Sequence, residues 1–317
     1  MLRVVTVFGA TGFIGRHLIQ RLAKTGAQVR VVTRDTEAAK FLKPMGNVGQ
    51  IVPVPCNLGA ATAESLAPLV DGADAVVNLV GLLAEGGHQT FSALQAEGPG
   101  KIAAAAAKAG VAKFVQVSAI GADAGSDAKY AATKAQGEAA VREAFPAAVI
   151  LRPSIVFGPE DKFFNRFASM ARTFPVVPVV GPKTRFQPVY VGDVADAIMA
   201  CLRRADVAGR TFELGGPRSY SFAELLDIIF GAIAVKKPVI ALPFGIAALV
   251  APIIGLLPGK LLTSDQVKLL KQDNVVSPGA STLGDLGIEP ESVEAIVPSY
   301  LTRFRPGGRF AGLRPGV

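Results

Sequence analysis

The sequence predicts an α/β protein built on a doubly wound parallel sheet, with a smaller and discontinuous α/β region toward the C-terminus. In the first half, short apolar segments rich in β-branched residues alternate with segments of helical periodicity. The connections between the predicted strands are long enough to hold helices, as parallel pairing requires. After Ile150 the alternation gives way to short apolar pieces separated by prolines, which indicates a second region.

Each predicted element follows from its local pattern. Val4–Phe8 is apolar and β-branched, as a strand buried on both faces should be. Residues 13–24 carry apolar side chains at helical spacing, and the pattern stops at Gly26, a common residue at helix C-termini. The other predicted elements of the sheet domain are strands at 29–33, 51–54, 75–79 and 114–118 and an alanine-rich helix at 100–108.

The length of the chain, 317 residues, is about twice that of an ordinary domain of roughly 150 residues, so two regions are expected. The larger region is the predicted sheet domain, and the smaller one is expected to bind a substrate or a partner. We assign residues 1–156 and 187–216 to the sheet domain, 157–186 and 217–300 to the smaller region, and 301–317 to a basic tail.

The charge balance is basic, with 33 Lys and Arg against 25 Asp and Glu and a formal net charge of +8. Such a surface favours anionic partners: nucleotides, nucleic acid or membrane phospholipid. Nucleic acid is not expected, because the chain has no basic strand interleaved with aromatic residues. Cys56 and Cys201 lie far apart and only two histidines are present, so no disulfide framework and no metal site are expected, and a cytoplasmic setting fits.

One segment, residues 238–258, contains no ionisable side chain. Pro243 and Pro252 divide it into pieces shorter than the about 20 residues that a membrane-spanning helix needs. Two interpretations stay open at this point. The segment is either a buried helical hairpin of the second region or an interfacial or partner-docking surface with lysines at its rim.

A glycine-rich turn joins the first predicted strand to the first predicted helix. Gly9 allows a tight turn, Gly12 lets the backbone approach a pyrophosphate, and Gly15 permits close packing of helix on strand. The N–H groups and dipole of the helix N-terminus then favour the phosphate charge. This context predicts a Rossmann-like dinucleotide site, whose candidate residues in the turn are Gly9, Thr11, Gly12, Phe13, Ile14, Gly15 and Arg16.

The end of the second predicted strand carries the residues that would distinguish two dinucleotides. A guanidinium there binds the 2′-phosphate of NADP, whereas a carboxylate binds the 2′-hydroxyl of NAD. Arg34 comes first and could be supported by Arg16 or Lys43, so NADP(H) is preferred. Asp35 follows directly and keeps NAD(H) as an alternative.

Ser118, Tyr130 and Lys134 form a candidate catalytic set. Ser118 ends a predicted strand, and Tyr130 and Lys134 lie four residues apart on one face of a predicted helix. A lysine one turn away is expected to lower the pKa of the tyrosine, which could then move a proton while hydride moves. Ser118 would hold the carbonyl or hydroxyl oxygen of a substrate.

These residues together resemble the extended and atypical short-chain dehydrogenase/reductase superfamily over about the first 235 positions. Within it, the chain is similar to the family of nucleotide-binding accessory subunits of respiratory complex I and their bacterial homologues, and this likeness extends through the whole chain. The stretches that carry it are Phe41–Val54, Ile150–Arg172, Arg185–Ile198, Phe212–Leu226 and Leu262–Gly279.

The resemblance implies tightly bound NADPH with a mainly structural role. It places pyrophosphate on the glycine turn, the 2′-phosphate on Arg34, and the nicotinamide ribose beside Tyr130 and Lys134. Asn57 stands where many relatives have Asp. The cofactor set implied beyond the turn is Arg34, Asn57, Leu58, Asn78, Val80, Gly81, Ser118, Tyr130, Lys134 and Pro153.

Two functions are therefore expected from the sequence. The first is an NADP(H)-binding accessory or assembly subunit of complex I, peripheral on the cytoplasmic side of the inner membrane. Its partners would be peripheral-arm subunits and an anionic membrane surface, near quinone or lipid, and the tail, in which no acid follows Glu294, could reach either. The second is an NAD(P)-dependent reductase, epimerase or dehydratase acting on a lipid-, quinone- or sugar-linked substrate through Ser118, Tyr130 and Lys134.

Overall fold

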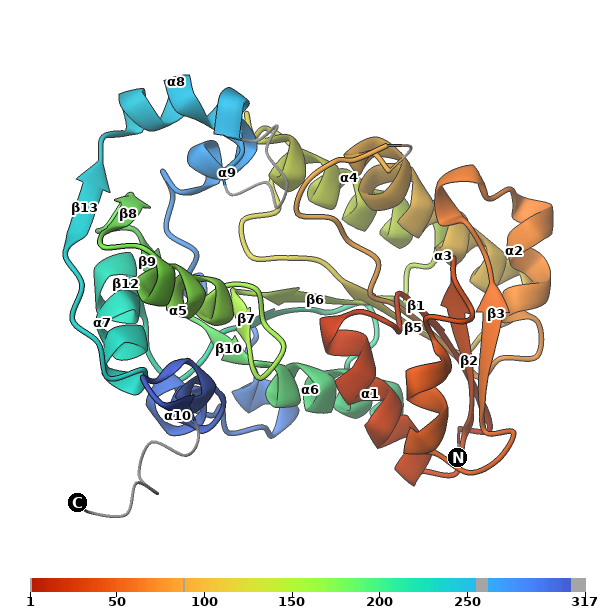
Figure 1. Cartoon of the computed structure of the whole chain (residues 1–317). Helices are drawn as coiled ribbons and strands as arrows, with labels where there is room; N and C mark the ends of the chain where they lie inside the picture. The colour runs from red at the N-terminus through yellow and green to blue at the C-terminus, as the bar shows by residue number, and fades with distance from the viewer. Residues whose placement is uncertain (1, 88, 255–261, 309–317) are drawn as a thin grey trace, which may run out of the picture. The chain divides into compact units, whose positions relative to one another are not determined.

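The computed structural model describes residues 2–87, 89–254 and 262–308 (Figure 1). By their internal contacts, the residues fall into two compact units. Unit 1 comprises the described residues of 1–153, 191–214 and 277–288, and unit 2 comprises those of 154–190, 215–276 and 289–308.

Unit 1 is built on a seven-stranded sheet in the order β11-β6-β5-β4-β1-β2-β3, with parallel pairing between neighbours. The strands are β1 (Val4–Phe8), β2 (Gln28–Thr33), β3 (Ile51–Pro55), β4 (Ala75–Asn78), β5 (Lys113–Val117), β6 (Val149–Pro153) and β11 (Thr211–Leu214). The register aligns Val7 with Val31 on one side and with Val77 on the other. These inner positions are fully buried, which explains the nearly continuous apolar runs in the sequence.

Helices cover both faces of this sheet (Figure 1). They are α1 (Phe13–Lys24), α2 (Ala63–Val70), α3 (Gly98–Lys108), α4 (Lys129–Ala144) and α6 (Val191–Arg203). α1 packs against α6, and α3 packs against both α2 and α4. This arrangement confirms the predicted doubly wound parallel sheet, and the predicted strands match the observed ones to within two residues at each end.

Residues 277–288, predicted from the sequence to belong to the smaller region, lie in unit 1. The N–H of Glu213 donates to the carbonyl of Ser281 at 2.8 Å, and the N–H of Ser277 donates to the Glu213 carboxylate at 2.7 Å. The position of residues 277–288 could not be predicted from the sequence. It is fixed by backbone hydrogen bonds to the edge strand β11, which any residue type can form.

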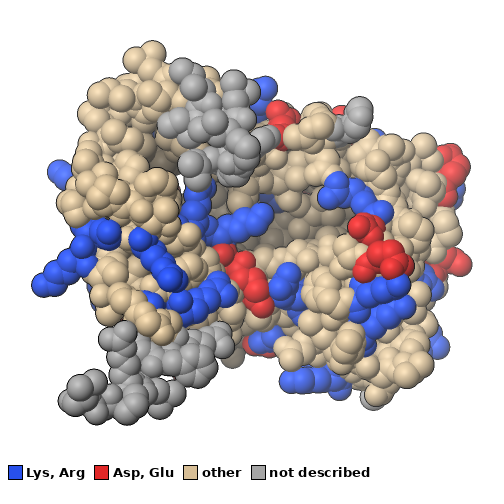
Figure 2. Space-filling model, in the orientation of Figure 1, with Lys and Arg blue, Asp and Glu red and all other residues tan. Residues whose placement is uncertain are grey.

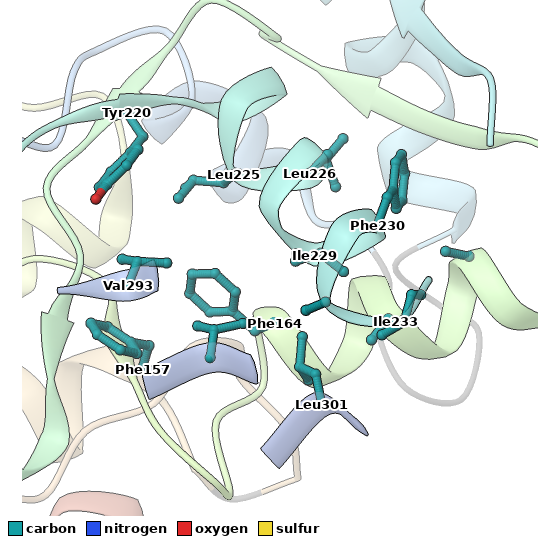
Figure 3. Close-up of a cluster of buried hydrophobic side chains, with 14 of the residues drawn as sticks. Phe157, Phe164, Tyr220, Leu225, Leu226, Ile229, Phe230, Ile233, Val293 and Leu301 are labelled. Atoms are coloured by element: carbon teal, nitrogen blue, oxygen red, sulfur yellow. The ribbon is translucent and has the colours of Figure 1, made fainter. Parts of the chain in front are cut away.

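Unit 2 has its own hydrophobic core, in which large apolar side chains from several elements meet (Figure 3). Its longer elements are α5 (Phe164–Thr173), β8 (Val177–Val180), α7 (Phe222–Ala232), β13 (Val239–Leu242), α8 (Phe244–Ile254), α9 (Ser264–Leu269) and α10 (Val293–Leu301). Its short strands are β7 (Val156–Phe157), β9 (Arg185–Phe186), β10 (Val189–Tyr190) and β12 (Tyr220–Ser221). A capping box between Ser221 and Glu224 begins α7.

A buried carboxylate, Asp161, ties two helices of this core together. Oδ1 accepts the backbone N–H of Phe164 at 2.6 Å, at the start of α5, and Oδ2 accepts the hydroxyl of Tyr300 in α10 at 2.7 Å. Burial raises the pKa of Asp161, although these hydrogen bonds act in the opposite direction. Protein N–H and O–H groups therefore take the place of water as hydrogen-bond donors to the Asp161 carboxylate.

The described part of the uncharged run, residues 238–254, is not a buried hairpin. β13 pairs in parallel with β8, but Val239 and Ile240 stay exposed. α8 buries Ala247 and Ala251 and leaves Ile246 51% and Leu249 77% exposed. In Figure 2 the surface over α8, at the upper left, is free of charged atoms. Residues 255–258 lie outside the described residues.

Across the described ranges, no helix combines the length and the apolar character needed to cross a bilayer.

We expect Asp161→Ala to lower the free energy of unfolding by about 3 kcal/mol, because several buried donors lose one acceptor. Tyr300→Phe is the control, since it removes a single hydrogen bond and should cost about 1 kcal/mol. Urea unfolding followed by circular dichroism measures both. Equal losses in the two variants would contradict the anchoring role of Asp161.

Candidate nucleotide-binding site

The turn after β1 needs glycine at two positions for different reasons. Gly9 has a φ of +76°, and a Cβ there would lie 3.0 Å from the backbone of Leu79. A Cβ on Gly15 would lie 2.2 Å from the carbonyl oxygen of Ala10, so only glycine lets α1 approach the turn this closely. Gly12 precedes α1 without a side-chain cap among the described residues, and the first turn of the helix has no acid. The helix N-terminus is thus suited to an anion.

The other candidate residues lie where neighbouring strands end. Because the sheet is parallel, the carboxyl ends of its strands share one edge, and the strand order reverses between β1 and β4. At this edge Arg34 follows β2, Asn57 follows β3, Asn78 ends β4 and Ser118 follows β5. The topology therefore brings residues that are distant in sequence to the region that ligands of such sheets occupy.

Asn78 is a positioning residue for the loop after β4. Its amide nitrogen donates to Gln116 Oε1 at 2.9 Å, and its Oδ1 accepts the N–H of Val80 at 3.1 Å. The side chain is fully buried. Its amide therefore fixes the path toward Val80 and Gly81 from within the protein.

Gln95 is a further residue of this region, and no sequence pattern predicts it. It lies in a π-helical turn, Ser92–Glu97, and is buried. Its Oε1 accepts the N–H of Leu82 at 2.9 Å, and its Nε2 donates to Thr133 of α4 at 3.3 Å. π-helical turns often mark functional sites. No residue pattern announces one, so nothing in the sequence pointed to Gln95.

Arg34 and Asp35 have different surroundings. The Asp35 carboxylate accepts the N–H of Ala38 at 3.0 Å and so caps the turn that follows β2. The Arg34 guanidinium is exposed and lies against the side-chain amide of Gln89. Arg34 therefore offers a cation at the end of β2, while the Asp35 carboxylate is engaged in the turn.

Arg16, which was expected to support Arg34, stacks on an aromatic ring. Its guanidinium carbon lies 5.2 Å from the centroid of Phe41, in the 3₁₀ segment Lys40–Met45. Lys43 lies exposed in the same segment. A cationic side chain is therefore present on α1, Arg16, and another on the 3₁₀ segment, Lys43.

Three further candidate residues have structural roles: Asn57, Leu58 and Pro153. Asn57 is exposed, and its carbonyl accepts the N–H of Ala60 to begin a 3₁₀ turn. Leu58 is buried and packs in the core of unit 1. Pro153 ends β6, and its carbonyl accepts the N–H of Ile120 at 3.0 Å. The described ranges contain no group of three side chains able to hold a metal ion.

Lys134 links the catalytic candidates. Its Nζ donates to the carbonyl of Val117, the residue before Ser118, at 3.4 Å, and lies 6.0 Å from the ring centroid of Tyr130. Lys134 is 6% exposed and Ser118 4% exposed. The Ser118 hydroxyl is buried and has no hydrogen-bond partner among the described residues. A buried hydroxyl without a partner is costly, which fits a site whose polar ligand supplies the missing bond.

The pKa shifts differ from the sequence-based expectation. Burial raises the pKa of Tyr130 to about 12, so the expected lowering by Lys134 is wrong for this structure. Burial also lowers the pKa of Lys134 to about 8, although Glu138 acts in the opposite direction. At pH 7, Tyr130 is therefore a neutral hydroxyl donor beside a lysine that is mostly cationic. Both can donate hydrogen bonds to hydroxyl groups of a ligand.

These residues fit a dinucleotide. The glycine turn and uncapped helix suit a pyrophosphate, the exposed guanidinium of Arg34 suits a ribose phosphate, and the unpartnered hydroxyl of Ser118 suits a polar group of the ligand.

Three comparisons with known proteins bear on this site. A model of the "NAD dependent epimerase/dehydratase family" matches residues 5–215. NADH dehydrogenase [ubiquinone] 1 alpha subcomplex subunit 9 of Arabidopsis thaliana mitochondria is 36% identical over 96% of this chain and 79% of that protein. A ceramide reductase of Caulobacter vibrioides is 34% identical over 76% of this chain and 74% of that protein.

Among solved structures, the chain is similar to the NADPH-dependent quinone oxidoreductase QOR2 of Escherichia coli, complexed with NADPH. The TM-score is 0.75 and the sequence identity 18%, over 94% of this chain and 99% of that one. At this identity the likeness supports the fold alone. The family match and the two sequence relatives lead to one assignment. The chain belongs to the NAD dependent epimerase/dehydratase family, an NAD(P)-binding family of extended short-chain dehydrogenase/reductase type, and is homologous to subunit 9 of the NADH dehydrogenase 1 alpha subcomplex of complex I.

Proposed function

We propose that the chain is an NADP(H)-binding accessory or assembly subunit of respiratory complex I, in which the nucleotide mainly stabilises the fold. The observation that carries this proposal is the extent of the likeness to the NADH dehydrogenase subunit. It covers 96% of the chain and so includes unit 2, whereas the family match ends at residue 215. The ceramide reductase relative aligns over a smaller share of the chain, 76%.

The preference for NADP(H) rests on the end of β2. There the Asp35 carboxylate caps a turn, and the exposed Arg34 guanidinium can form charge-assisted hydrogen bonds to a 2′-phosphate. NAD(H) is the alternative that the family description keeps open. Lys134 and Tyr130 would donate to ribose hydroxyls, and Ser118 would hold a polar group at the nicotinamide end.

The partner surface that we propose is the exposed apolar side of β13 and α8. Ile246 and Leu249 project from a helix without charges, and Lys236 and Lys237 precede β13. Exposed apolar groups bordered by cations suit a protein partner beside an anionic membrane surface. Peripheral-arm subunits on the cytoplasmic side of the inner membrane, near quinone or lipid, would meet both requirements.

A second candidate function is a reductase, and a specific observation favours it. Ser118, Tyr130 and Lys134 are all present, and the Ser118 hydroxyl is buried without a partner among the described residues. When bound, NADPH would supply the hydride for reduction of a carbonyl carbon. The Tyr130 hydroxyl would give its proton to the carbonyl oxygen, which Ser118 would hold, while the Lys134 cation stabilises the resulting phenolate. The ceramide reductase relative makes a lipid-linked carbonyl the substrate class to test.

Deletion of the gene is expected to reduce the content and activity of complex I in respiratory membranes. Tyr130→Phe should restore both, because a structural nucleotide needs no proton transfer. Blue-native electrophoresis and NADH:quinone activity measure the outcome.

The control for this complementation is Gly15→Leu, which places side-chain atoms against the carbonyl of Ala10 and should fail to bind NADPH or to restore complex I. A Tyr130→Phe protein that binds NADPH normally and yet fails to complement would favour the reductase instead.

Arg34→Ala is expected to weaken NADPH binding by about 10- to 100-fold and to leave NADH binding nearly unchanged, because only NADPH has the 2′-phosphate. Calorimetric titration of nucleotide-free protein measures both affinities. Asp35→Asn is the matched control, since its carboxylate serves the turn, and it should change neither affinity by much. Equal losses for the two nucleotides after Arg34→Ala would contradict the assignment.

Ile246→Ser combined with Leu249→Ser should reduce recovery of complex I subunits in affinity capture by about tenfold, because exposed anchors of an interface are lost. Folding should be unaffected, since both side chains are exposed. Val48→Ser is the control: this side chain of unit 1 is also exposed and apolar, and its loss should leave recovery unchanged. Undiminished capture by the double variant would show that this surface does not bind the partner.

A further inference from the structure

Three charged side chains of alternating sign, Glu213, Arg152 and Glu138, lie in series in unit 1, and Lys134 follows them. The Arg152 guanidinium of β6 donates to both carboxylate oxygens of Glu138 in α4, from Nε at 2.9 Å and from Nη2 at 2.6 Å. On its other side, Arg152 Nη1 lies 3.6 Å from the carboxylate of Glu213 in β11. Both carboxylates are buried, and Arg152 is only partly exposed. Fork-to-fork geometry of this kind fixes position as well as charge.

Glu138 also lies one helical turn after Lys134. Residues four apart on a helix share a face, and both of these side chains are buried. The order of charges is therefore Lys134, Glu138, Arg152 and Glu213, two cations alternating with two carboxylates. Tyr130 lies one turn before Lys134 on the same helix.

The surroundings of Lys134 otherwise favour its neutral form. Desolvation is the larger effect on its pKa, and Glu138 opposes it. The groups near Lys134 from the packed elements are uncharged: the Tyr130 ring, the Val117 carbonyl and the loop at Gly81, where Gln95 Oε1 also lies. Arg152 lies beyond Glu138 and partly offsets its charge, and Glu213 lies beyond Arg152. Glu138, one helical turn away, is thus the charged group that favours the protonated form of Lys134.

We propose that Glu138, whose carboxylate also pairs with Arg152, is a positioning residue that keeps Lys134 protonated in the nucleotide site. This inference rests on the proposed nucleotide-binding function, because Lys134 would use its charge to bind the nucleotide ribose. Glu138 itself acts only through Lys134. In the reductase alternative the same charge would stabilise the Tyr130 phenolate.

The direct test measures the pKa of Lys134 in nucleotide-free protein. Lysine labelled with ¹³C at Cε reports the titration by NMR, and Lys134→Arg identifies the signal. Glu138→Gln keeps the shape of the side chain and should lower the pKa of Lys134 by about one unit, since the nearby opposite charge is lost. Glu213→Gln is the matched control: it removes a buried carboxylate that pairs with the same Arg152 and should leave this pKa within about 0.3 units. An unchanged pKa in Glu138→Gln overturns the proposal.

Arg152→Gln tests the proposal in the opposite direction and does not depend on the folding of Glu138→Gln. Loss of the guanidinium leaves the charge of Glu138 uncompensated, so the pKa of Lys134 should rise. A fall or no change overturns the proposal.

A second readout separates this inference from the proposed function. In calorimetric titrations across pH 6–9, the pH above which NADPH binding weakens should fall in Glu138→Gln by the same amount as the Lys134 pKa. If the pKa moves and the binding profile does not, Lys134 does not bind nucleotide through its charge, and the functional link is wrong. If the parent protein binds no NADPH at any pH, the proposed function fails, while the NMR result still decides the role of Glu138.

Discussion

The close approach of α1 to the turn after β1 is the constraint on which the nucleotide site depends. Only glycine at position 15 lets the helix begin against the Ala10 carbonyl, and only a positive φ at Gly9 turns the chain out of the sheet beside Leu79. The strand order reverses at this point, so the N-terminus of α1 meets the ends of the neighbouring strands. The anion-binding character of the site is thus a property of backbone geometry.

The side chains around this turn divide into two groups. One group presents hydrogen-bonding atoms at the strand ends or along α4: Arg34, Ser118, Tyr130 and Lys134. In the other group, the side-chain amides of Asn78 and Gln95 form hydrogen bonds within the protein and hold loops in place. Burial shifts two members of the first group: it raises the pKa of Tyr130 to about 12 and lowers that of Lys134 to about 8. A site of this kind can bind a nucleotide tightly without turning it over, and the same groups would serve a reductase. Both functions therefore share one physical basis.

Much of the fold and part of the site could be predicted from the sequence. Buried strands and the glycine turn are local patterns, so the parallel sheet and the turn follow directly from them. The direction of the Tyr130 pKa shift could not be predicted, because it depends on desolvation that a one-turn spacing does not reveal. Gln95 and Glu138 were missed for a related reason: their roles come from a π-helical turn and from contacts with other strands. The exposure of α8 likewise depends on which of its apolar residues find partners.

The central claim is that an NADP-type dinucleotide binds at the end of β1 through the helix N-terminus and a guanidinium. The most direct measurement is calorimetric titration of nucleotide-stripped protein with NADPH and, separately, with NADH. The account predicts one NADPH per chain, bound at least about tenfold more tightly than NADH, since a charge-assisted phosphate contact is worth about 1.5–3 kcal/mol. Absence of binding heat with either nucleotide, together with an unshifted melting temperature, would contradict it.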